Sequence, residues 1–168
     1  DLRLSRGLGD VYKRQILARS NTFKSIRNSM DSLSFLELDT PTLTKSTPEG
    51  AKDFLVPSRK QSGSFYALPQ SPQMYKQLFM ISGFNKYYQI AKCYRDEDSR
   101  KDRQPEFTQL DLEILNGTPD EVRKTTETIV KELLDNVFSI KVDVPFRDMT
   151  HKYACLLYTS DAADECLC

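Results

Sequence analysis

The sequence has no tryptophan and only one histidine, His151, among its 168 residues. A Ser-His-Asp triad or a Cys-His dyad would depend on that single ring, so neither is expected. No G-x-x-x-x-G-K-[ST] segment occurs, which excludes a phosphate-binding loop of that class. Histidine and cysteine residues at metal-ligand spacing are missing as well. We therefore expect no metal bound by protein side chains.

Long apolar runs and an excess of one charge are also missing. No stretch approaches the roughly 18 apolar residues that span a bilayer, so we expect no membrane partner. The 24 basic and 24 acidic residues cancel, which removes any bulk attraction to nucleic acid. Since 39% of the residues are hydrophobic, the chain can bury a core. A contact with RNA would have to be local.

Both ends of the sequence need a separate interpretation. Residues 10–15 and 155–160 can be encoded by the two strands of one inverted DNA repeat, as a translated transposon-type sequencing adapter would be. A natural tail is the alternative, and neither end resembles a signal or transit peptide. We expect a non-native leader at 1–15, one domain at 16–154 and a non-native tail at 155–168. Cys93 is then the one cysteine of the domain, which suits a reducing compartment.

Three segments have the pattern of helices. Residues 23–33 and 118–137 carry apolar stripes with spacings of three and four. Thr118 and Glu121 have the spacing of a capping box at the start of the second stripe. A shorter helix should occupy residues 71–83, with serine as N-cap, proline in the first turn and glycine at its end.

Strands are expected at 35–40, 64–68, 87–95 and 106–115, and a polar loop at 42–56. In the last strand, apolar and polar residues alternate, which predicts one face packed on helices and one polar face. A ligand-bearing floor and a merely solvated face both fit that pattern. Together the elements indicate an α+β fold in which an antiparallel sheet is flanked by helices.

Residues 96–105, between the last two strands, include seven charged residues of mixed sign. Such a tip is most often a solvated loop, but the letters around it are specific. The segments CYRDED (93–98) and DRQPEFTQ (102–109) resemble motif 2 of the class II aminoacyl-tRNA synthetases. Further blocks that resemble the aspartyl-tRNA synthetases of bacteria and organelles are TPEGA (47–51), DFLVPSR (53–59) and ALPQSPQ (67–73).

The resemblance covers residues 16–154 and implies part of a class II catalytic domain. It implies that L-aspartate is activated with ATP and Mg²⁺ to aspartyl-adenylate and then transferred to tRNA(Asp). Negative charge that builds on the α-phosphate calls for a fixed guanidinium, and Arg95 matches the family's catalytic arginine. The positions that match ATP-binding residues are Arg95, Asp96, Glu97 and Gln104, with Phe107 as the ring on which adenine stacks.

The amino acid needs a cation for its side-chain carboxylate and acceptors for its ammonium group. By resemblance, Lys76 reads the carboxylate, and it follows Gln73 by three residues on the same helix face. Glu49 and Gln73 match aspartate-binding positions, and Glu49 belongs to a loop at 44–51 that closes over the substrate. Asp111, on the polar strand face, would orient Lys76 or the ammonium group. Without the family, Lys76 would be read as an ordinary surface lysine.

The remaining expectations concern partners and place. The charged tip would contact the acceptor end of the tRNA through Arg100, Lys101 and Arg103. Motif 1, which ends at Pro41, would form a homodimer. The compartment would be the bacterial cytoplasm or the mitochondrial matrix.

The resemblance also implies parts outside residues 16–154: an anticodon-reading β-barrel, an inserted domain, and motif 3 with a second ATP-binding arginine. The isolated chain should therefore be inactive. Lysyl- and asparaginyl-tRNA synthetases share this fold, but a cation at Lys76 favours an acidic substrate. The remaining alternative is a non-catalytic paralogue that binds tRNA or protein, against which the presence of Arg95, Glu97 and Glu49 speaks.

Overall fold

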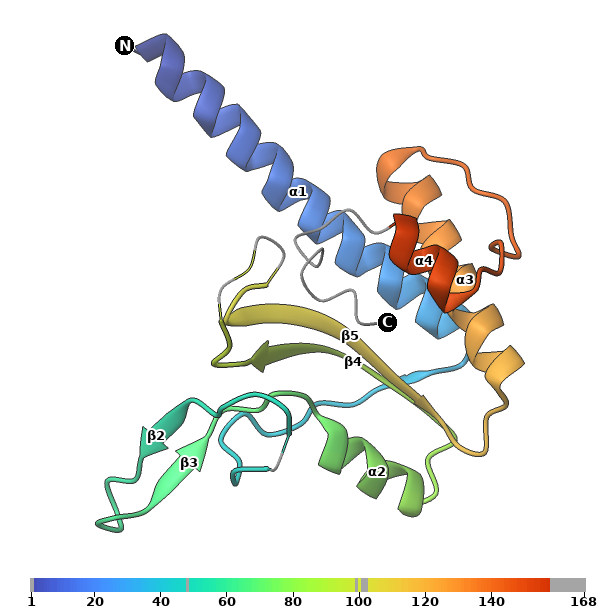
Figure 1. The fold of residues 1–168 in the computed structure, drawn as a ribbon. Helices are drawn as coiled ribbons and strands as arrows, with labels where there is room; N and C mark the ends of the chain where they lie inside the picture. Colours follow the sequence, from blue (N-terminus) through green and yellow to red (C-terminus); the bar gives the residue numbers. More distant parts are fainter. Residues whose placement is uncertain (1, 48, 99, 101–102, 158–168) are drawn as a thin grey trace.

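The computed structural model describes residues 2–47, 49–98, 100 and 103–157. Figure 1 shows a small sheet between two layers of helices. In chain order the elements are α1 (Leu2–Ser32), β1 (Leu36–Glu37), β2 (Leu55–Pro57), β3 (Phe65–Ala67), α2 (Gln73–Ile81), β4 (Lys86–Tyr94), β5 (Glu106–Ile114), α3 (Pro119–Phe138) and α4 (His151–Leu157).

The larger sheet has the strand order β1-β4-β5. β4 and β5 form an antiparallel hairpin that pairs from Lys86 and Ile114 to Tyr94 and Glu106, while β1 pairs with β4 in parallel. The predicted α+β fold and its hairpin are therefore confirmed. A second sheet, β2 with β3, was not expected. Its first strand overlaps the end of the predicted loop at 42–56. The strand was missed because three residues ending in proline are too few to show alternation.

The core lies between the β4–β5 hairpin and the pair α1 and α3, which cover one face of the sheet (Figure 1). Its buried members are Ile26, Met30, Phe35, Tyr88 and Ile129. The apolar face of β5 packs against them through Leu110, Leu112 and Ile114, as the alternation predicts. Complete burial of a core side chain such as Met30 contributes about 1.5–3 kcal/mol. The opposite face of the sheet is left for α2 and for polar residues.

The helix ends agree only in part with the sequence pattern. The hydroxyl of Thr118 accepts a hydrogen bond from the backbone N–H of Glu121 at 3.2 Å, which confirms the predicted cap. Gly83 follows α2 with φ of 93°, a left-handed conformation suited to glycine. Ser71 was expected to cap α2 and does not, because Pro72 is the N-cap residue. The hydroxyl of Ser71 points to Glu49 instead.

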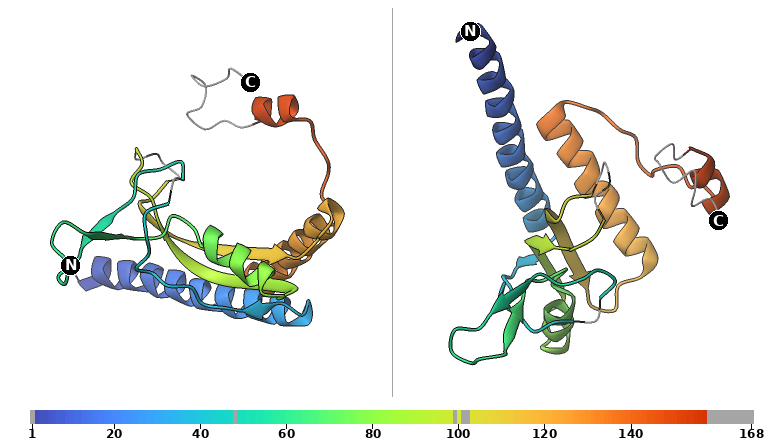
Figure 2. Two further views of the ribbon diagram at one scale, coloured as in Figure 1. Left: turned by 90° about the horizontal axis from the view of Figure 1, so that it is seen from below. Right: turned by 60° about the vertical axis from the view of Figure 1, so that its left-hand side comes forward.

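The two ends of the described chain extend away from the core. α1 begins at Leu2, far before the predicted residue 23, and its side chains at 9–17 are all exposed. Figure 2 shows the segment after α3 leading away from the sheet. Arg123 pairs with Asp148 at 2.9 Å and holds this segment to α3. The division at residues 15 and 154 stays a prediction, and residues 158–168 of the expected tail lie outside the described residues.

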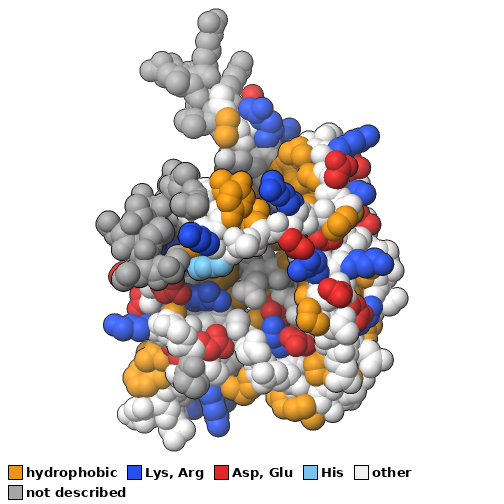
Figure 3. All heavy atoms as spheres, turned by 45° about the vertical axis from the view of Figure 1, so that its right-hand side comes forward, with side chains coloured by type: hydrophobic (Ala, Val, Ile, Leu, Met, Phe, Trp, Pro, Cys, Tyr) orange, Lys and Arg blue, Asp and Glu red, His pale blue; other side chains and the backbone are white. Residues whose placement is uncertain are grey.

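The surface carries both signs of charge. Figure 3 shows Lys and Arg interspersed with Asp and Glu on the face it presents, without a large patch of one sign. Over the described residues, no helix is both long enough and apolar enough to cross a membrane.

Candidate functional site

Lys76 of α2 lies over the polar face of the β4–β5 hairpin. Its Nζ is 3.0 Å from Oδ1 of Asp111 and 3.2 Å from Oε2 of Glu113. The two carboxylates belong to alternate positions of β5, so both point to the same face. Gln109, one more alternate position along, donates from Nε2 to Oδ1 of Asp111 at 3.2 Å. Asp111 and Lys76, both predicted to bind aspartate, are thus in direct contact.

The surroundings keep this lysine charged. Burial alone would lower the pKa of Lys76, but the hydrogen bonds and negative charges of Asp111 and Glu113 outweigh it and raise the pKa above its usual value. Burial, followed by the charge of Asp111, also raises the pKa of the Tyr87 hydroxyl. That hydroxyl donates to Oε1 of Gln89 at 2.9 Å. Lys76 is therefore a cation at neutral pH, held in place by two carboxylates of β5.

A cavity of about 450 Å³ lies at the end of the hairpin. Four of the residues predicted to bind ATP line it: Arg95, Glu97, Gln104 and Phe107. β4 delivers Arg95 just past its last residue, and β5 delivers Phe107 at its second residue. The hairpin register thus brings together residues 12 positions apart. Asp96, the fifth predicted residue, lines a neighbouring cavity and donates its backbone N–H to the carbonyl of Lys52 at 3.0 Å.

The side chains of this cavity contact one another. The guanidinium carbon of Arg95 lies 5.0 Å from the centre of the Phe107 ring, a cation–π arrangement. Arg95 Nε also donates to the backbone carbonyl of Gln70 at 3.3 Å. Arg103, expected to contact tRNA, is 3.4 Å from Oε2 of Glu97. A ligand that binds Glu97 or Arg103 must therefore compete with their mutual ion pair.

Glu49 lies on a different side of the site. Its carboxylate accepts from the hydroxyl of Ser71 at 3.3 and 3.4 Å, and it lines a cavity of about 200 Å³ together with Ser71 and Tyr75. Gln73 was expected to share the aspartate site, but its side chain is exposed and is not part of this lining. Glu49 contacts Ser71, whereas Lys76 contacts Asp111 and Glu113, so these described residues form two separate clusters.

The sequence prediction missed several members of the site. Gln70 is buried and hydrogen-bonded to the loop that carries Glu49, and Ser71 reaches Glu49 itself. Glu113 forms the second ion pair of Lys76. Gln70 and Ser71 stand in the ALPQSPQ block, and Glu113 follows Asp111 by two residues on the polar face. Sequence order signals their presence, but only the fold brings them to their partners.

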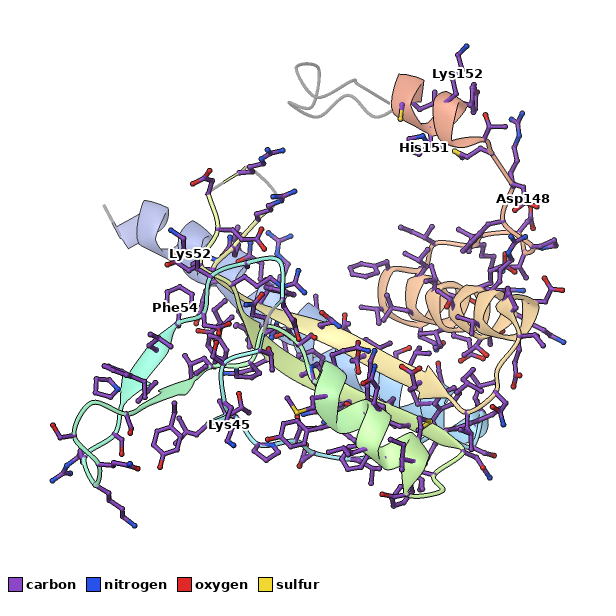
Figure 4. All side chains as sticks on the ribbon, turned by 60° about the horizontal axis from the view of Figure 1, so that its bottom comes forward. Lys45, Lys52, Phe54, Asp148, His151 and Lys152 are labelled. Carbon is purple, nitrogen blue, oxygen red and sulfur yellow. The ribbon has the colours of Figure 1, made fainter. Side chains whose placement is uncertain are left out.

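Two other predicted residues, Pro41 and Arg100, lie elsewhere. Pro41 is exposed and lines a cavity of about 330 Å³ between the segment that follows β1 and the strand β4. Arg100 lines the cavity next to Asp96 and Lys52, and Figure 4 shows Lys52 near the end of the hairpin. Lys101 lies outside the described residues.

The family of the chain follows from comparison with known proteins. The family model for tRNA synthetases class II (D, K and N) matches residues 3–167. The chain belongs to this family. It is 54% identical over 155 residues to the aspartate–tRNA(Asp/Asn) ligase of Borreliella afzelii, and that match covers 92% of this chain. It is 52% identical over 146 residues to the protein of the same name from Bacillus cytotoxicus, which covers 87% of this chain.

A third relative of this class II synthetase carries a narrower name. The aspartate–tRNA ligase of Clostridium perfringens is 53% identical over 146 residues, covering 87% of the chain. The matches span 26%, 25% and 24% of the three relatives. The class II synthetase chain therefore spans about a quarter of the length of the curated relatives it matches.

Proposed function

We propose that this chain supplies part of the catalytic domain of an aspartate–tRNA ligase. The whole protein would join L-aspartate to ATP, forming aspartyl-adenylate and pyrophosphate, and then transfer the aspartyl group to tRNA(Asp). One observation carries the proposal: Arg95, Glu97, Gln104 and Phe107, each matched to ATP by sequence, line one cavity. The relatives are named as ligases for aspartate, which supports the choice of amino acid.

The reacting end of ATP would lie against Arg95. In-line attack by the aspartate carboxylate builds negative charge on the α-phosphate, and a guanidinium held by Gln70 and Phe107 stabilises that charge without having to reorganise. The Phe107 ring would stack on adenine, a contact worth about 1–3 kcal/mol. In the present geometry Arg95 covers one face of the ring, so adenine would take the other face.

The amino acid would lie between Lys76 and Glu49. Lys76 is a cation in a partly buried position, which suits a side-chain carboxylate. Glu49, on the loop before β2, would accept from the ammonium group together with Asp111, and Gln73 would complete the contacts. Because Glu49 and Lys76 lie in separate clusters, we infer that the loop moves toward α2 when aspartate binds.

Further partners follow from the same family. Arg100, Lys101 and Arg103 would contact the acceptor end of the tRNA. A homodimer would form through the motif 1 region, where Pro41, Leu36 and Leu43 are exposed. ATP would enter with Mg²⁺, and the bacterial relatives support the bacterial cytoplasm as the compartment.

The test is exchange of pyrophosphate into ATP that depends on aspartate. The whole protein should show it with aspartate and not with asparagine or lysine. Replacing Arg95 with alanine should lower the rate about 100- to 1,000-fold. The isolated chain should show none, because the described lining of the ATP cavity comes from one hairpin only. The proposal would be overturned if pyrophosphate exchange by the whole protein depended on lysine, or if the whole protein showed no exchange that depends on aspartate.

A further inference from the structure

Gln70 is 2% exposed, and its side-chain amide binds the loop that carries Glu49. Nε2 donates to the carbonyl of Ala51 at 2.8 Å and to Oδ1 of Asp53 at 2.5 Å. Oε1 accepts from the backbone N–H of Ala51 at 3.2 Å. Two acceptors on one side and a donor on the other determine how the amide is oriented. Both backbone groups of Ala51 are thereby satisfied by one side chain.

Asp53 extends this contact to the other end of the loop. Its second oxygen, Oδ2, accepts from the hydroxyl of Ser46 at 2.5 Å. Ser46 precedes Glu49 by three residues and Asp53 follows it by four, so the two close the base of the loop. Gln70 therefore binds the loop at its base, where Ser46 and Asp53 meet, and Glu49 lies between these two residues in sequence.

The backbone of the same segment contacts the ATP side. The carbonyl of Gln70 accepts from Arg95 Nε at 3.3 Å. The carbonyl of its neighbour Pro69 accepts from the backbone N–H of Tyr94 at 2.9 Å. One buried residue thus contacts the Glu49 loop through its side chain and the Arg95 guanidinium through its main chain.

We infer that Gln70 is a positioning residue that ties the Glu49 loop to Arg95, so that the aspartate side and the ATP side of the site hold one common geometry. This inference rests on the proposed function for the roles of Glu49 and Arg95. Gln70 itself lines neither the Arg95 cavity nor the Glu49 cavity. Because the two sides share one buried support, binding on one side restricts the other, and such coupling is reciprocal.

The structural half can be tested on the chain without any activity. In Gln70→Glu an oxygen replaces Nε2 and faces the Ala51 carbonyl and the Asp53 carboxylate, so attraction becomes repulsion. Amide hydrogen exchange at Ala51, whose N–H donates to Gln70, should become about 10- to 100-fold faster. Gln61→Glu, the same change at an exposed position in the β2–β3 turn, is the matched control and should leave it unchanged. Unchanged exchange at Ala51 in Gln70→Glu would overturn the inference.

A second substitution separates positioning from general damage. In Gln70→Glu combined with Asp53→Asn, the new amide of residue 53 can donate to the new carboxylate while its oxygen still accepts from Ser46. The pair should recover at least half of the lost protection on a logarithmic scale. If the amide of Ala51 exchanges as fast in the double variant as in Gln70→Glu alone, the inference that the contact between residues 70 and 53 positions the loop is wrong.

The functional half uses the whole protein. Gln70→Glu should raise the KM for aspartate about tenfold, as expected for a loss near 1.4 kcal/mol, and should weaken the mutual effect of aspartate and ATP on each other's KM. A merely structural role would lower kcat through loss of active protein and leave both KM values unchanged, which would overturn the inference. Absence of aspartate-dependent exchange in the unsubstituted protein would instead overturn the proposed function, while hydrogen exchange still decides whether Gln70 holds the loop.

Discussion

Lys76 of α2 and Asp111 of β5 are 35 residues apart in sequence, and their charged atoms lie 3.0 Å apart with side chains only 13% and 4% exposed. A helix and a strand must pack face to face for this pair to form. Glu113 adds a second carboxylate at 3.2 Å, so the cluster carries one negative charge in excess. Such a cluster suits a zwitterionic acidic amino acid, whose ammonium group can offset the excess while its carboxylate approaches Lys76.

Replacing Lys76 with methionine keeps most of the side-chain volume and removes the cation. In the whole protein, kcat/KM for aspartate in pyrophosphate exchange should fall about 30- to 5,000-fold, because removing one partner of a buried charge pair costs about 2–5 kcal/mol. Lys92→Met is the matched control, since Lys92 pairs with Glu106 in an exposed ion pair. It should change the same quantity less than about fivefold. Equal effects of the two substitutions would contradict the assignment of Lys76.

A different ion pair should make the stability of the fold depend on pH. Arg27 of α1 donates to both oxygens of Glu37 in β1, at 2.9 to 3.2 Å. The hydrogen bond from Arg27 lowers the pKa of Glu37 below its usual value of 4.5, against a smaller opposing effect of burial. Because the pKa of Glu37 is lower in the folded chain than in the unfolded chain, the ion pair stabilises the fold fully at pH values above the unfolded pKa. This stabilisation is lost as the pH falls through the pKa of Glu37 in the folded chain.

Glu37→Gln should therefore reduce the acid sensitivity of the chain. Because the arginine side chain is half exposed, the contribution is limited to about 0.5–1 kcal/mol. Urea unfolding between about pH 7 and pH 3 should show a steeper loss of unfolding free energy for the unsubstituted chain than for the variant. Parallel curves for the two proteins would show that this ion pair does not stabilise the fold.

Cys93 is expected to be unreactive while the chain is folded. It is fully buried in β4, and burial raises the pKa of its thiol to about 11, with Arg95 opposing the shift. At pH 8 the thiolate fraction should be about 100-fold smaller than for an ordinary cysteine. Labelling with iodoacetamide, followed by peptide mass analysis, should modify Cys155 long before Cys93. In denaturant the two should react at similar rates, and fast labelling of Cys93 in the folded chain would contradict its burial.

Part of this structure could be predicted from the sequence because the signals are local. The alternation along β5 gave both faces of the strand, and Thr118 marked the start of α3. The tip residues Arg95 and Phe107 were assigned through family resemblance, and the hairpin register places them in one cavity. β2 was missed because three residues that end in a proline carry no period, and Ser71 was misassigned because its hydroxyl binds Glu49, which is distant in sequence.

The contacts that could not be predicted are those that join separate segments. Gln70 has three hydrogen bonds to residues 17 and 19 positions away, and no local pattern distinguishes such a glutamine from a solvated one. Likewise, the sequence of β5 indicates only that Glu113 belongs to its polar face. The ion pair with Lys76 appears only when α2 packs on that face. Polar side chains gain their role from tertiary packing, whereas apolar periodicity shows in the sequence before folding.

The C-terminal end of α3 offers a change that should stabilise the fold. Ser139 caps this helix in a left-handed conformation, with φ of 55° and ψ of 30°, and its N–H donates to the carbonyl of Asp135 at 3.0 Å. A residue with a Cβ pays roughly 1–2 kcal/mol for this conformation, while glycine loses more conformational freedom on folding. Ser139→Gly should therefore raise the unfolding free energy by about 0.5–1 kcal/mol in urea unfolding. Gly83→Ala, at φ of 93° after α2, is the reverse change and should lower it by about 1 kcal/mol. If both substitutions move the unfolding midpoint in the same direction, backbone conformation is not what decides stability at these two helix ends.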